Sequence, residues 1–282
     1  MEKIHKEALI KLLDDPSPIV HESLLGEFQK LNEEAISFLK SIIGSGDKHL
    51  ADAAKAYLHE IAGSDGIDVF RSFIYSFQYE LETGCILLDR TLYPEVEPEH
   101  ISVFIDGMAE RCKELVAPPF DPTQLCRVIN QVMFHECGFH GDREEFYSPD
   151  NSFLHKVIER RKGIPITLSI IYLLVAQRCG LQLEPIALPG RFIVGCFQDS
   201  MPFYIDPYEG GVMMSEEEVQ FLLYHYNVTE TSQYLAPVTV GETLARMCRN
   251  LAHQYVTANH EQRARLFLTF LQDFEEAYRR NS

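Results

Sequence analysis

The first eighty residues alternate short amphipathic segments with proline and glycine breaks. Apolar residues recur there every three or four positions, which is the spacing of a helix with one buried face. Breaks are expected at Asp14–Pro18, Gly44–Gly46 and Gly63–Ser64. The apolar positions between them are Leu9, Leu12, Leu13; Val20, Leu24, Leu25, Phe28, Leu31; Ile36, Leu39, Ile42, Ile43; and Leu50, Ala53, Ala54, Tyr57, Leu58, Ile61. The pattern predicts a small antiparallel helical array over residues 1–80, either loosely similar to HEAT repeats or an ordinary helical cap on the next domain.

The rest of the chain changes from helical to extended spacing and back. Short β-branched or aromatic runs, bounded by proline or glycine, predict the strands Leu183–Leu188, Phe192–Phe197 and Phe203–Ile205. Helical spacing then returns, with an apolar stripe of Leu244, Met247, Cys248 and Leu251. Helices, consecutive strands and helices again predict an α+β fold. We expect a core over residues 81–235, with C-terminal helices over 236–282 packed on it.

Composition and charge narrow the choice of partners. Of 282 residues, 46% are hydrophobic and 24% charged, as in ordinary globular proteins. The formal net charge of −17 argues against nucleic acid and membrane surfaces as partners, because both need a basic footprint. The longest apolar stretch, Ile164–Ala176, is too short and interrupted to span a bilayer, and the N-terminus lacks a signal-peptide pattern. We therefore expect a cytoplasmic protein whose seven cysteines are mostly buried free thiols.

One segment has the composition of a metal site. His135, Cys137, His140 and Asp142 lie close together in the sequence. Zinc sites usually combine two distant ligand pairs, and no second pair at ligand spacing is present. We therefore expect neither a metal nor another cofactor. The segment is interpreted as a helix end followed by a turn, with the glycines at 138 and 141 as capping residues.

Two later segments predict helix starts. Asp150–Phe153 is expected to cap the helix that follows it through Leu154, Val157 and Ile158. Gly163–Thr167 opens a second helix, which should end at Cys179–Gly180. A proline suits the first turn of this second helix, since its missing N–H costs no hydrogen bond there.

A longer stretch of the sequence resembles a known family. The run NSFLHKVIERRKGIPITLSIIYLLVAQRCGLQLEPIALPGRFIVGC begins at Asn151, and YIDPYEGG begins at Tyr204. With flanking matches over about residues 80–260, these runs resemble the transglutaminase-like proteins of the SirB invasion-regulator type. The resemblance implies a papain-type core, in which a small antiparallel sheet packs on a central helix.

The resemblance also implies where a catalytic triad would lie. Catalytic members of the superfamily carry a cysteine in the first turn of the central helix, a histidine on one strand and an aspartate on the next. The helix N-terminus favours a thiolate, and the carboxylate orients the histidine that moves protons. On this chain the corresponding positions are Pro165, Arg191 and Asp206. Proline has no nucleophile and arginine stays protonated, so two of the three roles are missing.

Neighbouring residues are poor replacements for the missing nucleophile. Thr167 lies on another face of the helix from Pro165, and Ser169 lies one turn deeper, where burial is expected. Cys196 follows Arg191 by five positions on the same strand and should point to the opposite face. Arg191 and Asp206, on adjacent strands, are expected to form a salt bridge in place of the catalytic pair.

Three functions are compatible with these features. The first is a non-catalytic transglutaminase-like protein, a pseudoenzyme that acts as a binding or regulatory module for a protein partner. The second is a cysteine hydrolase or acyltransferase with a relocated nucleophile. The third is a helical-repeat scaffold for protein–protein interaction, in which the transglutaminase-like part is structural. The first is favoured, because function has to be argued from the site, and this site lacks its nucleophile and its base.

Overall fold

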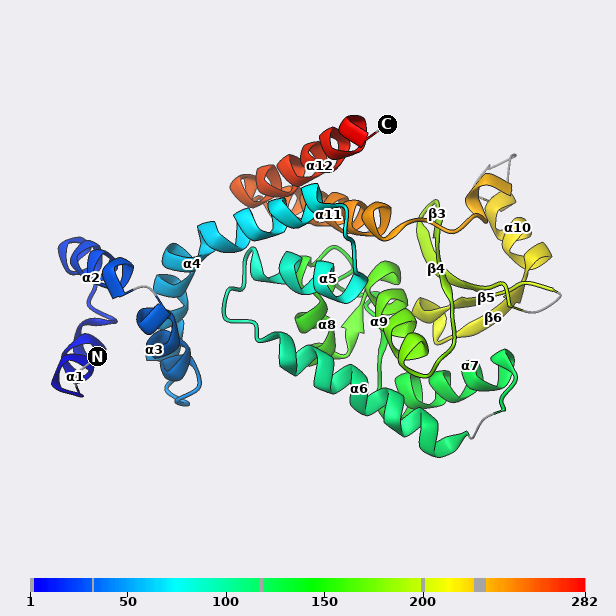
Figure 1. The fold of residues 1–282 in the computed structure, drawn as a ribbon, viewed down its shortest axis with the longest axis horizontal. Helices are drawn as coiled ribbons and strands as arrows, with labels where there is room; N and C mark the ends of the chain where they lie inside the picture. The colour runs from blue at the N-terminus through cyan, green and yellow to red at the C-terminus, as the bar shows by residue number, and fades with distance from the viewer. Residues whose placement is uncertain (1–2, 32, 117–118, 199–200, 226–231, 282) are drawn as a thin grey trace. The chain divides into compact units, whose positions relative to one another are not determined.

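The computed structural model of the chain describes residues 3–31, 33–116, 119–198, 201–225 and 232–281 (Figure 1). Its contacts divide the chain into two compact units. The first comprises Met1–Ser72 and Leu87–Val96, and the second comprises Phe73–Ile86 and Glu97–Ser282. Within the described ranges, no helix combines the length and the apolar composition that crossing a membrane requires.

The first unit contains helices that share an apolar core. They are α1 (Lys3–Leu12), α2 (Pro18–Leu31), α3 (Glu33–Ile43) and most of α4 (Lys48–Ser76). Phe28 and Tyr57 meet edge to face in this core, with ring centroids 5.3 Å apart. The predicted apolar residues pack in this core, except Leu12, which is 41% exposed, and the core also includes Ala35 and Phe38, which the prediction did not name. Its buried residues are Leu9, Leu13, Leu24, Phe28, Ala35, Phe38, Leu39, Ile42, Ala54, Tyr57 and Leu58.

Helix α4 continues through a predicted break. The expected end at Gly63–Ser64 is wrong, because α4 runs to Ser76. A glycine inside a helix costs only about 1 kcal/mol relative to alanine, which packing readily offsets. The buried side of the helix also changes along its length: Ala54 and Phe70 are both fully buried, although their spacing rotates them by about 160° around the axis. A pattern with one apolar face therefore does not describe this helix.

The second unit is built around helix α9 (Pro165–Arg178). Every side chain from Pro165 to Ala176 is buried, which is typical of a helix surrounded by protein on all sides. Its start at Pro165 and its end just before Gly180, which has a φ of +79°, confirm the predicted limits. The other helices, of which α5 only begins in this unit, are α5 (Leu81–Arg90), α6 (Pro98–Leu115), α7 (Pro122–Asn130), η1 (Gln131–Glu136), η2 (Pro149–Asn151), α8 (Leu154–Arg160), η3 (Pro207–Glu209), α10 (Glu216–His225), η4 (Ser232–Tyr234), α11 (Val240–Thr257) and α12 (Glu261–Asn281).

A four-stranded antiparallel sheet packs on α9. Helix α9 contacts two of its strands, and α10 contributes to an apolar cluster with Ile186, Ile193 and Tyr204 of the sheet. The predicted α+β fold, with a small antiparallel sheet on a central helix, is confirmed. The fourth strand is missed by the prediction, since four residues that include two methionines carry little strand signal. The strands follow in the order β3 (Glu184–Leu188), β4 (Arg191–Cys196), β5 (Phe203–Asp206) and β6 (Val212–Ser215).

The predicted cap of α8 is wrong. Phe153 is the N-cap residue of this helix, and no side chain caps it. The polar residues before it bond elsewhere: Asn151 Nδ2 donates to the Glu145 carbonyl (2.7 Å), and the Ser152 hydroxyl donates to Oε1 of Gln254 (2.7 Å). Asn151 and Ser152 are fully buried. A buried polar side chain needs a partner wherever the fold supplies one, and here that requirement outweighs a local cap.

The two glycines of the His135–Asp142 segment have different roles. Gly138, with a φ of +75°, follows the helical segment η1 and its C-cap residue Cys137, as predicted. Gly141 does not cap a helix, because it lies in the short strand β1 (His140–Gly141), which is parallel to β2 (Lys162–Gly163). A Cβ on Gly141 would lie 2.5 Å from the ring of Tyr208, so this position requires glycine for close packing.

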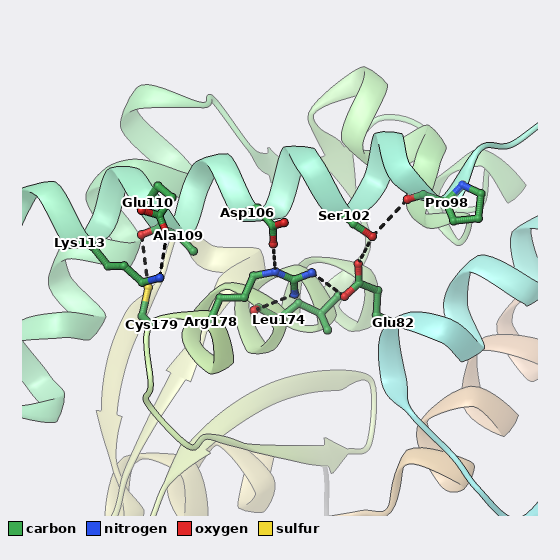
Figure 2. Close-up of polar contacts among 10 residues, drawn as sticks. All are labelled: Glu82, Pro98, Ser102, Asp106, Ala109, Glu110, Lys113, Leu174, Arg178 and Cys179. Atoms are coloured by element: carbon green, nitrogen blue, oxygen red, sulfur yellow. Dashed lines mark hydrogen bonds and ion pairs between the residues drawn. The ribbon is translucent and has the colours of Figure 1, made fainter.

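Ion pairs hold the C-terminal end of α9, as Figure 2 shows. Arg178, in the last turn of α9, pairs through Nη2 with Glu82 Oε2 of α5 (2.7 Å) and through Nε with Asp106 of α6. The Ser102 hydroxyl also donates to Glu82 (2.7 Å). A cation in the last turn of a helix interacts favourably with the helix dipole. These contacts tie α5, α6 and α9 together at the end of α9 opposite Pro165.

The turn after β5 contains two adjacent glycines with positive φ, Gly210 (+71°) and Gly211 (+80°). The Gly211 carbonyl accepts a hydrogen bond from Asn130 Nδ2 (2.7 Å), and a Cβ on Gly211 would lie 2.2 Å from the Asn130 side chain. We expect Gly211→Ala to lower the free energy of unfolding by about 3 kcal/mol. The new Cβ displaces the Asn130 amide from its hydrogen bond, and alanine also bears the cost of a left-handed backbone conformation.

Urea denaturation measures this loss, and Gly210→Ala is its matched control. A Cβ on Gly210 meets no atom within 4 Å, so this control should lose only about 1 kcal/mol, the cost of the left-handed backbone alone. Equal losses in the two variants would show that the Asn130 contact does not hold the turn.

Candidate functional site

The polar groups of the first turn of α9 bond within the protein. The Thr167 hydroxyl accepts a hydrogen bond from the N–H of the N-cap residue Ile164 (3.2 Å) and donates to the Asn151 carbonyl (2.8 Å). The Ser169 hydroxyl is fully buried, as predicted, and donates to the Phe192 carbonyl (2.9 Å). Both hydroxyls therefore serve the packing of α9.

The predicted salt bridge between Arg191 and Asp206 is present. Arg191 Nη1 donates to Asp206 Oδ2, and Arg191 Nη2 lies 3.9 Å from Glu209 Oε1. The strand register places Gly195 opposite Tyr204. Because side chains alternate along a strand, Arg191 on β4 and Asp206 on β5 lie on the same face of the sheet.

Both carboxylate oxygens of Asp206 are engaged by the protein. Oδ1 accepts hydrogen bonds from the N–H groups of Tyr208 (3.0 Å) and Glu209 (3.3 Å), which caps the short helix η3. Oδ2 faces Arg191, and the side chain is only 2% exposed. Burial raises the pKa of Asp206, and the charge of Arg191 opposes that rise. The aspartate is thus a structural anchor of the turn as well as a partner of the arginine.

A cavity of about 340 Å³ lies at the N-terminal end of α9. Pro165, the first residue of the helix, and Arg191 both line it, and α11 supplies much of the rest. Among the described residues that form its wall there is no cysteine. The lining residues are Phe146, Tyr147, Ile164, Pro165, Ile166, Gly190, Arg191, Phe192, Arg246, Arg249, Asn250, His253 and Gln254.

The cysteines are free thiols, and none of them lines this cavity. Six are buried and Cys137 is half-buried, in line with the expectation from the sequence. Burial raises the pKa of Cys126 to about 12 and also raises the pKa of Cys137. A hydrogen bond from Cys112 lowers the pKa of Cys179, but Cys179 is the C-cap residue of the 14-residue helix α9, about 20 Å along it from Pro165.

The segment with metal-site composition directs its side chains to other partners. Asp142 is buried and accepts a hydrogen bond from Arg160 (3.2 Å), and His140 Nδ1 lies 3.0 Å from the Gly138 carbonyl. Hydrogen bonds to the Asp142 carboxylate lower its pKa although burial opposes this. Within the described parts of the chain, no three histidine, cysteine, aspartate or glutamate side chains come together in a way that would hold a metal ion.

Helix α11 is the part of the site that the sequence reasoning missed. Its apolar stripe is buried as predicted, and the next face presents Arg246, Arg249 and His253 to the cavity. These polar residues recur at helical spacing beside the buried stripe, so the sequence does indicate that the helix has a second, polar face. Nothing in the local sequence indicates that this face meets Pro165, about eighty positions earlier.

Comparison with known proteins agrees with this architecture. The family model described as the transglutaminase-like superfamily matches residues 99–249, more than half of the chain. The chain therefore belongs to the transglutaminase-like superfamily, and the UPF0162 proteins are its relatives there. The finer assignment to the SirB type stays a prediction.

Individual relatives match over different shares of their length. The UPF0162 protein of Xylella fastidiosa strain 9a5c is 30% identical over 191 residues, which are 65% of this chain and 68% of that protein. The UPF0162 protein of Vibrio cholerae is 25% identical over 147 residues, 52% of this chain and 54% of that protein. Human F-box only protein 21 is 31% identical over 137 residues, 46% of this chain and 21% of that protein. No solved structure matches the chain.

Proposed function

We propose that this protein is a non-catalytic member of its superfamily, which uses the cavity at the start of α9 as a binding or regulatory site for a protein partner. The observation that carries the proposal is Pro165 at the first position of α9, on the cavity wall. The resemblance assigns that position to the attacking sulfur in catalytic relatives. No sulfur lies there in this chain.

The chemistry of the remaining groups supports the same conclusion. Proline lacks a backbone N–H as well as a nucleophile, so residue 165 also has no amide with which to stabilise an oxyanion. Arg191 stays protonated and is bonded to Asp206, so it does not act as a general base. Acyl transfer by this route needs a nucleophile and a general base together, and these positions supply neither.

The reactivity of the native thiols tests this proposal against an enzyme with a relocated nucleophile. We expect iodoacetamide at pH 6.5 to modify none of the seven cysteines in the folded protein, because a catalytic thiol must be both ionised and accessible. Six of the cysteines are buried, and burial raises the pKa of the half-buried Cys137. Intact-protein mass spectrometry measures the modification. The same protein in 8 M urea at pH 8.5 is the control, in which all seven should react. Rapid modification of one cysteine in the folded state would overturn the proposal.

A further inference from the structure

The wall that α11 contributes to the cavity is positively charged. Arg246 and Arg249 line it together with His253, although the whole chain has a formal net charge of −17. Burial lowers the pKa of Arg246, and the charge of Arg249 lowers it further. The two guanidinium groups therefore repel each other, and that of Arg246 is partly shielded from water.

Neither of these arginines has an anionic partner in the part of the chain that the structure describes. Arg246 Nη2 donates to the carbonyls of Leu188 (2.8 Å) and Arg191 (2.7 Å), which fixes the guanidinium but leaves its charge uncompensated. By contrast, Arg178 and Arg191 of the same unit both pair with carboxylates. A partly buried cation loses hydration that only an anion restores well. The missing component of this wall is thus a negative charge.

Part of the cavity lining is apolar. Phe146, Ile164 and Phe192 form this part, and the Arg246 guanidinium carbon lies 5.5 Å from the centre of the Phe192 ring. A volume of about 340 Å³ is near the lower end for small-ligand sites, which suits a group the size of one amino-acid residue. The start of α9 adds the positive end of a helix dipole.

We infer that this cavity binds a carboxylate carried on an apolar body, an inference that rests on the proposed non-catalytic binding function. The forked guanidinium groups of Arg246 and Arg249 match a planar carboxylate, and the aromatic and aliphatic walls take the attached group. Inorganic phosphate satisfies the arginines but leaves the apolar walls unmatched. The ligand has two chemically equivalent sources: a free carboxylic acid, or the C-terminal residue of a partner protein.

Ligand-observed NMR and calorimetry with matched compounds test this inference on the full chain. The small-molecule arm compares 3-phenylpropionate with 3-phenylpropionamide, and the chain-terminus arm compares the peptide acetyl-Gly-Gly-Phe with its C-terminal amide. In at least one arm we expect the acid to bind about tenfold or more tightly than its amide, as the loss of a charge-assisted bond predicts. The arm whose acid binds more tightly shows whether the ligand is a free carboxylic acid or the C-terminal residue of a partner protein.

Substitutions connect this binding to the arginines. Arg249 is exposed at the cavity, so Arg249→Gln should leave the fold intact, weaken the acid about tenfold and leave the amide unchanged. The control Arg265→Gln removes one charge from an exposed pair with Glu261 on α12, and it should change neither the affinity for the acid nor that for the amide. Arg246→Gln removes hydrogen bonds to two backbone carbonyls and could therefore lower stability. In that case Arg249→Gln alone tests whether the arginines bind the carboxylate.

Several outcomes would overturn the inference: no binding by either acid, equal binding of acid and amide, or displacement of the bound acid by inorganic phosphate at equal concentration. Failure here is distinguishable from failure of the proposed function. Inert native thiols with no acid bound refute the carboxylate site alone, whereas a reactive native thiol refutes the non-catalytic function, whatever the cavity binds.

Discussion

Replacing Arg191 with alanine is expected to lower the free energy of unfolding by about 3–5 kcal/mol. The substitution leaves Asp206, a side chain only 2% exposed, as a buried carboxylate without its cation. The carboxylate of Glu209, which Arg191 also approaches at 3.9 Å, then adds repulsion. Urea denaturation at pH 7, followed by circular dichroism, measures the change.

This loss should also depend on pH. Burial raises the pKa of Asp206, and Arg191 opposes that rise, so the pKa increases further in the variant. An unfolded aspartate loses its proton near pH 4, and above that pH the folded variant therefore binds more protons than the unfolded one. By linkage, the stability of the variant falls as the pH rises from about 4 towards the folded pKa. The difference from the native sequence should be larger at pH 7 than at pH 4.

Two controls isolate the buried charge. Arg143 also pairs with Glu209 but is 69% exposed, so Arg143→Ala should cost no more than about 1 kcal/mol. Arg191→Met combined with Asp206→Asn removes both charges and keeps an oxygen to cap η3, so it should recover much of the stability lost in Arg191→Ala. If Arg191→Ala costs no more than Arg143→Ala, the pair is not a buried structural unit.

The second prediction is that Pro165→Cys creates a reactive thiol. The new sulfur would lie at the first position of α9, on the wall of a cavity that also contains Arg246 and Arg249. A helix N-terminus and nearby cations lower a cysteine pKa from about 8.5 to values between about 3.5 and 7.5. We expect iodoacetamide at pH 6.5 to label this thiol about 100-fold faster than any native cysteine, because six native thiols are buried and burial raises the pKa of the half-buried Cys137.

A cysteine elsewhere on the surface serves as the matched control. Leu268 is 47% exposed within α12, so Leu268→Cys provides an accessible helical thiol without a helix start or a cluster of arginines. At pH 6.5 the thiol at 165 should react about tenfold faster than this control. At pH 9 the two rates should converge, since both thiols are then mostly ionised. A thiol at 165 that reacts no faster at pH 6.5 would contradict the assignment of this position to the nucleophile.

Local sequence patterns predict most of the helices and strands that carry the residues of the site. The helix from Pro165, with a permissive proline at its start and Gly180 beyond its end, was predictable because both limits are set by backbone chemistry at single residues. Three of the four strands of the sheet were predictable because β-branched or aromatic runs bounded by proline or glycine are also a local signal. The errors occur where a local preference competes with distant packing: α4 crosses Gly63–Ser64, and Asn151 bonds into the core instead of capping α8.

Only some of the residues that line the cavity could be predicted from the sequence. Pro165 and Arg191, which the resemblance assigns to the catalytic positions, could be named from the order of motifs along the chain. The arginines of α11 could not, because the direction that a helix face takes depends on which surface its buried stripe meets. That choice is made by contacts between segments far apart in sequence, which leave no local signature.

By itself the sequence determined that residue 165 has no nucleophile and that residue 191 has no usable base, since both statements concern the covalent chemistry of single side chains. It also determined the helix and strands that carry these residues, since hydrophobic period and backbone preference act locally. The salt bridge between Arg191 and Asp206 was also predictable, because the resemblance places both residues on adjacent strands. Only the tertiary structure decided that Arg246 and Arg249 line the same cavity without such a partner. The pairing of charges depends on distances across the fold, and those distances exist only after the helices and the sheet have packed.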